Sequence, residues 1–154
     1  MKQDNDFESR RASMVDYQLV ARGIESPRVL EAMGRVAREQ FIPERMRDCA
    51  YEDGPLPIGA GQTISQPYIV ALMTEALDLE GGEKVLDIGT GSGYAAAVLG
   101  CIAGQVFSIE RVQELADRAA ATLASQGFDN VEVRCGDGTM GWPEHQPYDG
   151  IIVA

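Results

Sequence analysis

The chain has only one histidine among its 154 residues, and this scarcity limits the chemistry open to its side chains. Nucleophile–histidine–acid triads and histidine-rich metal sites both depend on imidazole groups. The sequence therefore gives little support to either, and we expect no metal site. The single histidine, His145, falls in the loop 142–147, where we interpret it as an incidental exposed residue.

Cysteines and long apolar runs are also scarce. Cys49, Cys101 and Cys135 are odd in number and lack C-x-x-C spacing, which favours reduced intracellular thiols over a disulfide framework or a zinc site. No apolar run approaches the length of a transmembrane helix, and the N-terminus has no signal-peptide core. We therefore expect a cytoplasmic protein with no membrane partner.

Basic residues are outnumbered, with 13 Lys and Arg against 24 Asp and Glu, for a net charge of −11. This balance argues against electrostatic binding to nucleic acid. The length suits one structural domain with a sizeable core. Within it we predict a disordered tail at 1–13, a helical region at 14–80, and an α/β core at 81–154.

The most informative stretch is a glycine-rich turn between an apolar strand at 84–88 and a helix. Its glycines, Gly89, Gly91 and Gly93, let the backbone approach a ligand closely, and the N-terminus of the following helix favours an anionic group. The spacing G-x-G-x-G brings the third glycine one residue earlier than in the dinucleotide fingerprint. Asp87 precedes the turn, at the carboxyl end of the strand.

A second acid follows the next predicted strand, at 105–109, and this acid is Glu110. A carboxylate there can accept hydrogen bonds from both hydroxyls of a ribose and would repel a 2′-phosphate. One alternative is a tight strand–helix turn with solvated acids. A nicotinamide-dependent oxidoreductase is another, disfavoured by the early third glycine.

The N-terminal half reads as helical with an irregular interruption. Apolar spacing predicts helices at 14–24 and 27–37, the second capped by Ser26, and another from 67 to about 77. Residues 44–61 lack periodicity and predict an irregular loop. Ser65 lies just before that third helix, so it is either an N-cap or a hydroxyl that faces a ligand.

The C-terminal half predicts a parallel sheet. Strands near 84–88, 105–109, 131–135 and 150–153, with helices between them, predict an α/β fold with strand order 3-2-1-4. Alternation at 131–135 indicates an edge strand, whose carboxyl end carries Asp137 and Gly138. The unbroken Ile-Ile-Val at the terminus is typical of a strand covered on both faces, so we expect a fragment of a longer protein or a covering partner.

These motifs resemble a known family. Residues 85–94 resemble the general motif of class I S-adenosylmethionine-dependent methyltransferases, which have a Rossmann-like fold. Residues 59–67, and 136–142 followed by 147–153, resemble segments particular to the protein-L-isoaspartate O-methyltransferase family. The resemblance covers essentially all of 14–154, whereas full members of the family continue through further strands.

The resemblance implies S-adenosyl-L-methionine as the cofactor and a catalytic Ser65 at the methyl-transfer site. In the family's arrangement the glycine turn holds the methionine moiety, Glu110 binds the ribose, and Asp137 accepts from the adenine amino group. The implied cofactor-binding residues are Gln62, Thr63, Ile64, Asp87, Gly89, Gly91, Gly93, Glu110, Asp137 and Gly138.

The implied reaction is methylation of the α-carboxylate of L-isoaspartyl residues in damaged proteins, followed by collapse of the ester to a succinimide. A carboxylic acid with a pKa near 4 is already ionised at neutral pH, so no general base is needed. Positioning then carries the catalysis, with the Ser65 hydroxyl orienting the carboxylate. The alternative is a catalytically silent fragment that binds cofactor or self-associates through its exposed strand.

Overall fold

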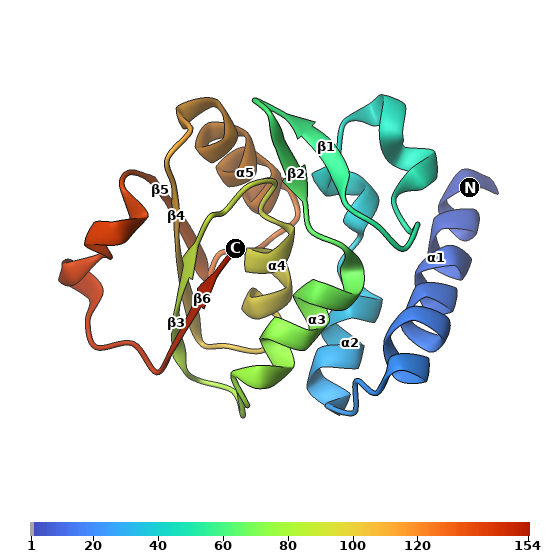
Figure 1. Cartoon of the computed structure of the whole chain (residues 1–154), viewed down its shortest axis with the longest axis horizontal. Coiled ribbons are helices and arrows are strands. Elements are labelled where there is room, and N and C mark those ends of the chain that lie inside the picture. Colours follow the sequence, from blue (N-terminus) through green and yellow to red (C-terminus); the bar gives the residue numbers. More distant parts are fainter. Residues whose placement is uncertain (1) are drawn as a thin grey trace.

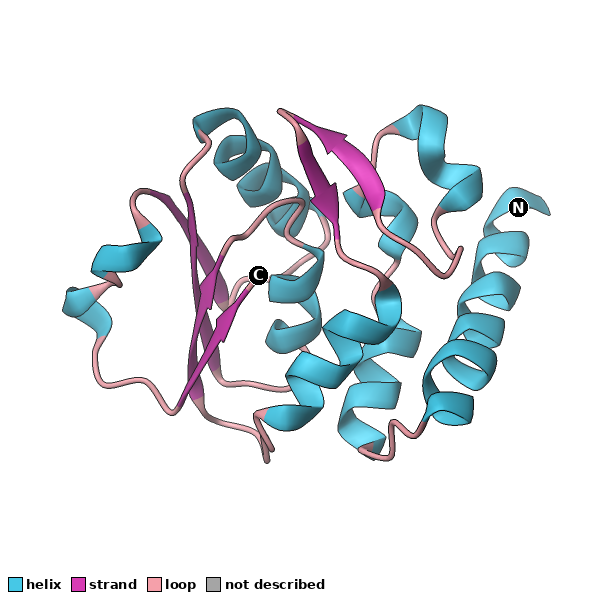
Figure 2. Cartoon of the chain, in the orientation of Figure 1, coloured by secondary structure: helices cyan, strands magenta, loops and turns pink. Residues whose placement is uncertain are grey.

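The computed structural model describes the backbone of residues 2–154 and the side chains from Asp6 onward. Figure 1 shows a sheet with helices on one side and the segment that follows β5 on the other. Figure 2 shows that the strands of the sheet run side by side, with a separate hairpin among the helices. The five α-helices described are α1 (Lys2–Met14), α2 (Pro27–Arg35), α3 (Pro67–Ala76), α4 (Tyr94–Gly100) and α5 (Gln113–Ser125).

The main sheet has four parallel strands in the order β5-β4-β3-β6. Their bounds are β3 (Lys84–Ile88), β4 (Gln105–Glu110), β5 (Val131–Cys135) and β6 (Gly150–Val153). This order confirms the predicted 3-2-1-4 arrangement, and β5 is an edge strand as expected. The carboxyl ends of the strands therefore meet at one edge of the sheet, where open α/β folds bind their ligands.

One continuous apolar core joins the N-terminal helices to the sheet. It includes Leu19 and Met33 from the N-terminal region, Val85 of β3, Leu99 of α4 and Leu115 of α5. Ser26 is the N-cap of α2, as predicted, and its hydroxyl accepts from the Val29 N–H. No helix in the described residues is both long and apolar enough to cross a bilayer.

The N-terminal region is more ordered than the sequence suggests. Residues 2–13 lie in α1, so the prediction of a disordered tail is wrong there; Met1 lies outside the described residues. The chain continues without a break through a π-helical turn, Val15–Leu19, and a 3₁₀ turn, Val20–Arg22. Partners distant in the sequence hold this helix, because Arg11 donates to the Tyr51 hydroxyl at 2.8 Å and to the Arg35 carbonyl at 3.1 Å.

The predicted irregular loop at 44–61 is also more regular than expected. It contains a 3₁₀ helix at Glu44–Cys49 and then β1 (Leu56–Gly59). Strand β1 pairs antiparallel with β2 (Gln62–Ile64). The tip of this hairpin has positive φ at Gly59, Ala60 and Gly61. This segment therefore showed no helical or strand periodicity because its strand is short and pairs with a strand close by in the sequence.

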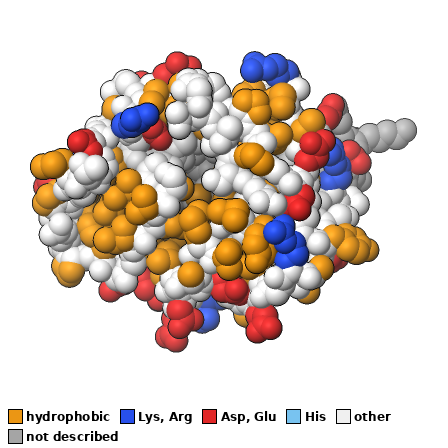
Figure 3. Space-filling view, viewed as in Figure 1, with side chains coloured by type: hydrophobic (Ala, Val, Ile, Leu, Met, Phe, Trp, Pro, Cys, Tyr) orange, Lys and Arg blue, Asp and Glu red, His pale blue; other side chains and the backbone are white. Residues whose placement is uncertain are grey.

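Strand β6 is covered on one of its two faces. Ile152 is buried in the main core, but Ile151 and Val153 on the other face are 55% and 67% exposed. One face of β6 is therefore uncovered within this chain, and the expectation of a longer protein or a covering partner stays a prediction. Ile69 and Leu72 of α3 are exposed as well, and Figure 3 shows apolar side chains gathered over β6 and α3.

The second face of the sheet is covered over β4 by a small aromatic cluster. Leu86, Phe107 and Ile109 pack there with Trp142. His145 stacks on Phe107 with ring centroids 3.9 Å apart and an interplanar angle of 18°. His145 is therefore a half-buried packing residue, and the expectation that it is exposed is wrong.

Candidate active site

A cavity of about 790 Å³ lies at the carboxyl ends of the strands. This volume suits a nucleoside-sized ligand. Its wall is formed by β2 and the residues after it, the glycine turn, the end of β4 and the segment after β5. Nine of the eleven predicted site residues line it: Gln62, Thr63, Ile64, Ser65, Gly89, Gly91, Glu110, Asp137 and Gly138.

The glycine turn is built from residues in left-handed conformations. Gly89, Gly91 and Gly93 have φ of 98°, 55° and 90°, which side chains with a Cβ rarely adopt. The Gly89 N–H donates to the Ile109 carbonyl at 2.9 Å, which ties the turn to β4. Gly93 does not line the cavity; it precedes α4, and a Cβ there would lie 3.3 Å from Leu123 of α5.

Glu110 is held by the turn that it faces. Its Oε2 accepts from the Gly91 N–H at 2.8 Å, and its Oε1 accepts from the Val112 N–H at 3.0 Å. The side chain is buried but borders the cavity. Each carboxylate oxygen has two lone pairs, so both oxygens keep acceptor capacity for a ligand.

Asp87 lies behind the cavity wall instead of in it. Its Oδ2 accepts from the Ser108 hydroxyl at 2.5 Å, and the Ser108 and Thr90 hydroxyls are 2.5 Å apart. Its Oδ1 has no hydrogen-bond partner among the described residues. Burial, with the Glu110 charge as a smaller contribution, raises the pKa of Asp87 to about 6, although the Ser108 hydrogen bond opposes this.

Asp137 is exposed, follows β5 and lines the same cavity as Glu110. Its Oδ1 accepts from the Thr139 N–H at 2.9 Å and from the Thr139 hydroxyl at 2.7 Å. These hydrogen bonds to the ionised form lower the pKa of Asp137. Because Glu110 and Asp137 border one cavity, a single ligand could contact both carboxylates.

Ser65 is half-buried and lines the cavity. The N-cap of α3 is Gln66, and no side chain caps that helix. Within the described residues, the Ser65 hydroxyl makes no intramolecular hydrogen bond, whereas its carbonyl accepts from Arg38 Nη2 at 2.8 Å. The geometry therefore leaves the hydroxyl available to a ligand instead of using it as a helix cap.

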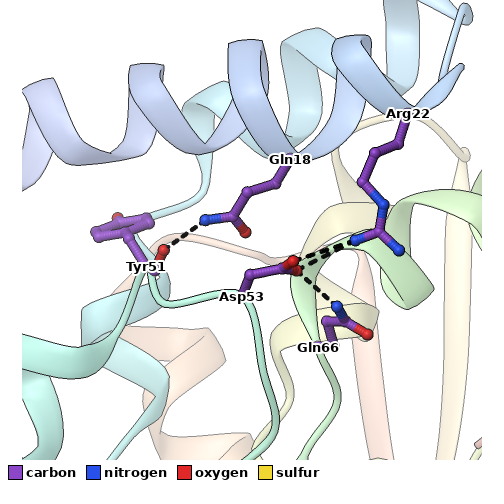
Figure 4. A network of polar contacts seen from close by, with 5 residues as sticks. All are labelled: Gln18, Arg22, Tyr51, Asp53 and Gln66. Atoms are coloured by element: carbon purple, nitrogen blue, oxygen red, sulfur yellow. Dashed lines mark hydrogen bonds and ion pairs between the residues drawn. The ribbon is translucent and has the colours of Figure 1, made fainter.

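The residue after Ser65 is tied to the N-terminal helix. Gln66 Nε2 donates to Asp53 Oδ1 at 2.6 Å, and Arg22 Nη1 lies 3.3 Å from the same oxygen. Gln18 donates to the Tyr51 carbonyl at 2.7 Å, so two side chains from one helix contact the loop that carries Asp53, as Figure 4 shows. These contacts restrain the loop that leads into the segment bearing Ser65.

Five further polar residues line the cavity that were not among the predicted site residues: Thr90, Ser92, Tyr94, Arg111 and Thr139. Thr90, Ser92 and Tyr94 belong to the glycine motif at 85–94, and Thr139 belongs to the family-like segment at 136–142, so their place in these motifs was the available signal. Arg111 follows Glu110 and is exposed. Nothing in its local sequence marked it as a cavity residue.

Known proteins resemble this chain in sequence. The family model described as protein-L-isoaspartate(D-aspartate) O-methyltransferase matches residues 9–154. Protein-L-isoaspartate O-methyltransferase 1 of Rhodopseudomonas palustris (strain HaA2) is 64% identical over 148 residues, which cover 96% of this chain and 60% of that protein. Protein-L-isoaspartate O-methyltransferase 2 of Marinobacter nauticus is 64% identical over 153 residues, covering 99% of this chain and 70% of that protein.

Solved structures agree on the fold. A protein-L-isoaspartate O-methyltransferase superposes with a TM-score of 0.82 at 33% identity, covering 92% of this chain and 47% of that one. A Plasmodium falciparum protein in complex with S-adenosyl-L-homocysteine superposes with a TM-score of 0.77 at 24% identity, covering 93% and 72%. The fold is that of the Rossmann-like methyltransferases.

Within that class, the chain belongs to the protein-L-isoaspartate(D-aspartate) O-methyltransferase family. It spans 60% of the length of the R. palustris relative and 70% of the M. nauticus relative.

Proposed function

We propose that this chain binds S-adenosyl-L-methionine and methylates the α-carboxylate of L-isoaspartyl residues in damaged proteins. The methyl ester then closes to a succinimide, whose hydrolysis returns some normal aspartyl linkage. The observation that carries this proposal is that Glu110, Asp137 and Ser65 all border one cavity. Family membership supports the same activity.

The cavity suits this cofactor by its donor set and by its close backbone approach. Glu110 offers acceptors for ribose hydroxyls, and Asp137 offers an acceptor for an adenine amino group. At Gly138 a Cβ would lie 2.5 Å from Ile88 Cγ2, so only glycine fits this part of the wall. The bound cofactor would supply a methyl group on a positively charged sulfur.

The substrate end of the cavity would be governed by Ser65. Because the substrate carboxylate is ionised at neutral pH, the chain need not remove a proton. The Ser65 hydroxyl can donate to one carboxylate oxygen and leave the other aimed at the methyl carbon. Attack forms the O–C bond as the C–S bond breaks, with its electron pair passing to sulfur, so alignment and exclusion of water are what the protein must provide.

The proposed partners are isoaspartyl-containing proteins and peptides, without nucleic acid or membrane. The excess of acidic residues supports the absence of a nucleic-acid partner. Three free cysteines, Cys49, Cys101 and Cys135, suit a reducing compartment and support the proposed cytoplasmic location.

Methyl transfer tests the proposal directly. The purified 154-residue chain would be incubated with methyl-labelled S-adenosylmethionine and an isoaspartyl peptide, with the normal aspartyl peptide of the same sequence as the control. We expect base-labile label in the isoaspartyl peptide alone. Equal labelling of both peptides would overturn the substrate assignment. Binding of S-adenosylhomocysteine without any transfer would favour a catalytically silent fragment.

A further inference from the structure

Arg38 is a fully buried cation beside the candidate active site. It begins the 3₁₀ turn η3 (Arg38–Phe41), and its side chain has no exposed surface. Its Nε donates to the Ala50 carbonyl at 2.8 Å, and its Nη2 donates to the Ser65 carbonyl at 2.8 Å. One guanidinium therefore bridges two backbone segments that are 15 residues apart, of which one carries the proposed catalytic hydroxyl.

The same guanidinium also contacts the other half of the cavity. Its Cζ lies 4.8 Å from the centroid of the Tyr94 ring. Tyr94 is buried, begins α4 directly after the glycine turn, and lines the cavity. Arg38 thus links the segment bearing Ser65 to the segment that carries the glycine turn.

Arg38 lacks the partner that a buried cation usually has. Within the described residues no carboxylate lies within ion-pair distance of it, and Nη1 has no hydrogen-bond partner. The neighbouring Glu39 is engaged elsewhere, by Arg11 Nη2 at 3.5 Å and by the Tyr51 hydroxyl. Burial lowers the pKa of Arg38. Such a site is unfavourable for stability, because a buried charge without a counter-charge loses its hydration.

The shape of arginine suits a positioning role. The guanidinium is planar, presents its donors in a fixed fork and can stack on an aromatic face at the same time. Lysine has a point charge on a flexible stem, so it cannot reproduce two fixed carbonyl contacts together with the stack. A displacement of about 1 Å at a reacting group can lower a rate by about a hundredfold.

We propose that Arg38 is a positioning residue, which holds the Ser65 backbone against the Tyr94 end of the glycine turn so that the Ser65 hydroxyl faces the cavity. This inference rests on the proposed function of Ser65. It assigns Arg38 no contact with the substrate or the cofactor.

Arg38→Lys tests this role, with Arg11→Lys as the matched control. Arg11 is also an arginine with a carbonyl partner and a tyrosine contact, but it lies at α1, away from the cavity. We expect Arg38→Lys to lower kcat for the isoaspartyl peptide by about tenfold or more, with the Kd for S-adenosylhomocysteine changed by less than about threefold. Arg11→Lys should retain kcat even where it lowers the melting temperature.

Hydrogen–deuterium exchange gives a readout that does not depend on activity. In Arg38→Lys, amides of residues 62–68 should exchange faster, while those of α5 remain as in the parent chain. Arg11→Lys should leave residues 62–68 unchanged. If Arg38→Lys fails to fold, Tyr94→Leu removes the stack and should produce the same exchange pattern.

The outcomes separate the two proposals. Absence of methyl transfer by the parent chain would count against the proposed function, and the exchange pattern would still decide the role of Arg38. Unchanged exchange at 62–68 together with unchanged kcat in Arg38→Lys would overturn the inference. A loss of kcat matched by equal loosening of α5 would show a general structural role and would also overturn it.

Discussion

The Glu110 carboxylate accepts a hydrogen bond from the Gly91 N–H at 2.8 Å, so the acid at the end of β4 holds the second glycine of the turn after β3. A second bond, from the Val112 N–H, holds the other carboxylate oxygen at 3.0 Å. The carboxylate is therefore oriented before any ligand binds. This preorganisation reduces the conformational freedom that nucleoside binding would otherwise have to remove.

Ser65→Ala should lower methyl transfer more than it lowers cofactor affinity. A hydrogen bond to a charged group contributes about 1.5–3 kcal/mol, so kcat should fall by roughly ten- to a hundredfold. Stability should change little, because no described residue bonds the hydroxyl. Steady-state kinetics and calorimetric titration with S-adenosylhomocysteine measure the two effects. Equal losses in both, or a loss in neither, would contradict the role of Ser65.

Gly138→Ala should destabilise the fold and narrow the cavity. The added Cβ would lie 2.5 Å from Ile88 Cγ2, an atom on a branched side chain within β3. Overpacking of this kind costs about 1–3 kcal/mol. Gly54→Ala is the matched control, because no atom lies within 4 Å of its Cβ and neither glycine has a positive φ. Thermal melts measure the difference. Equal decreases in melting temperature for the two variants would count against this account of the cavity wall.

Asp87→Asn should change how stability depends on pH. Burial first, and the Glu110 charge second, raise the folded pKa of Asp87 from 3.8 to about 6. The folded state then keeps a proton that the unfolded state releases. The free energy of unfolding of the parent chain should therefore fall as pH rises from about 4 to about 6, and level off above that.

The size of this effect follows from the shift. A pKa raised to about 6 corresponds to roughly 3 kcal/mol once the group is ionised in both states. Asp87→Asn lacks this titration, so its stability relative to the parent chain should increase across the same pH range. Urea denaturation at several pH values measures the difference. Parallel curves for the two proteins would show that Asp87 titrates normally.

His145→Ala should lower stability without affecting methyl transfer. The imidazole stacks on Phe107 and meets Trp142 edge-on, with centroids 5.0 Å apart. Aromatic contacts of this kind contribute about 0.5–1.5 kcal/mol beyond their buried area. His145→Phe keeps a stacking ring and should retain most of the stability. A drop in kcat with His145→Phe would instead implicate the imidazole in the chemistry.

The strands and their order could be predicted from sequence because they depend on local patterns. Apolar runs mark β3 and β4, and parallel strands joined by helices favour right-handed crossovers. Helix α1 could not be predicted, because its polar sequence is held by contacts such as Arg11 with Tyr51, which is 40 residues away. The hairpin β1–β2 escaped prediction because its strands are only four and three residues long.

The residues of the candidate site also differed in how far the sequence could predict them. Glu110 and Asp137 were expected together because both follow parallel strands, whose carboxyl ends share one edge. Asp87 also lies near the carboxyl end of a strand, but it is two residues from Val85 and so its side chain is on the core-facing side, which strand periodicity could have indicated. Arg38 gave no such signal, because its partners are backbone carbonyls that only the folded chain brings together.

Titration of S-adenosylhomocysteine into the purified chain tests the central claim, that one nucleoside occupies the cavity between Glu110 and Asp137. We predict saturable binding that NAD does not displace, weakened about tenfold or more by Glu110→Ala and by Asp137→Ala separately. Glu114→Ala, at an exposed position in α5, should leave the Kd unchanged. Displacement by NAD, or full affinity in both cavity variants, would contradict the claim.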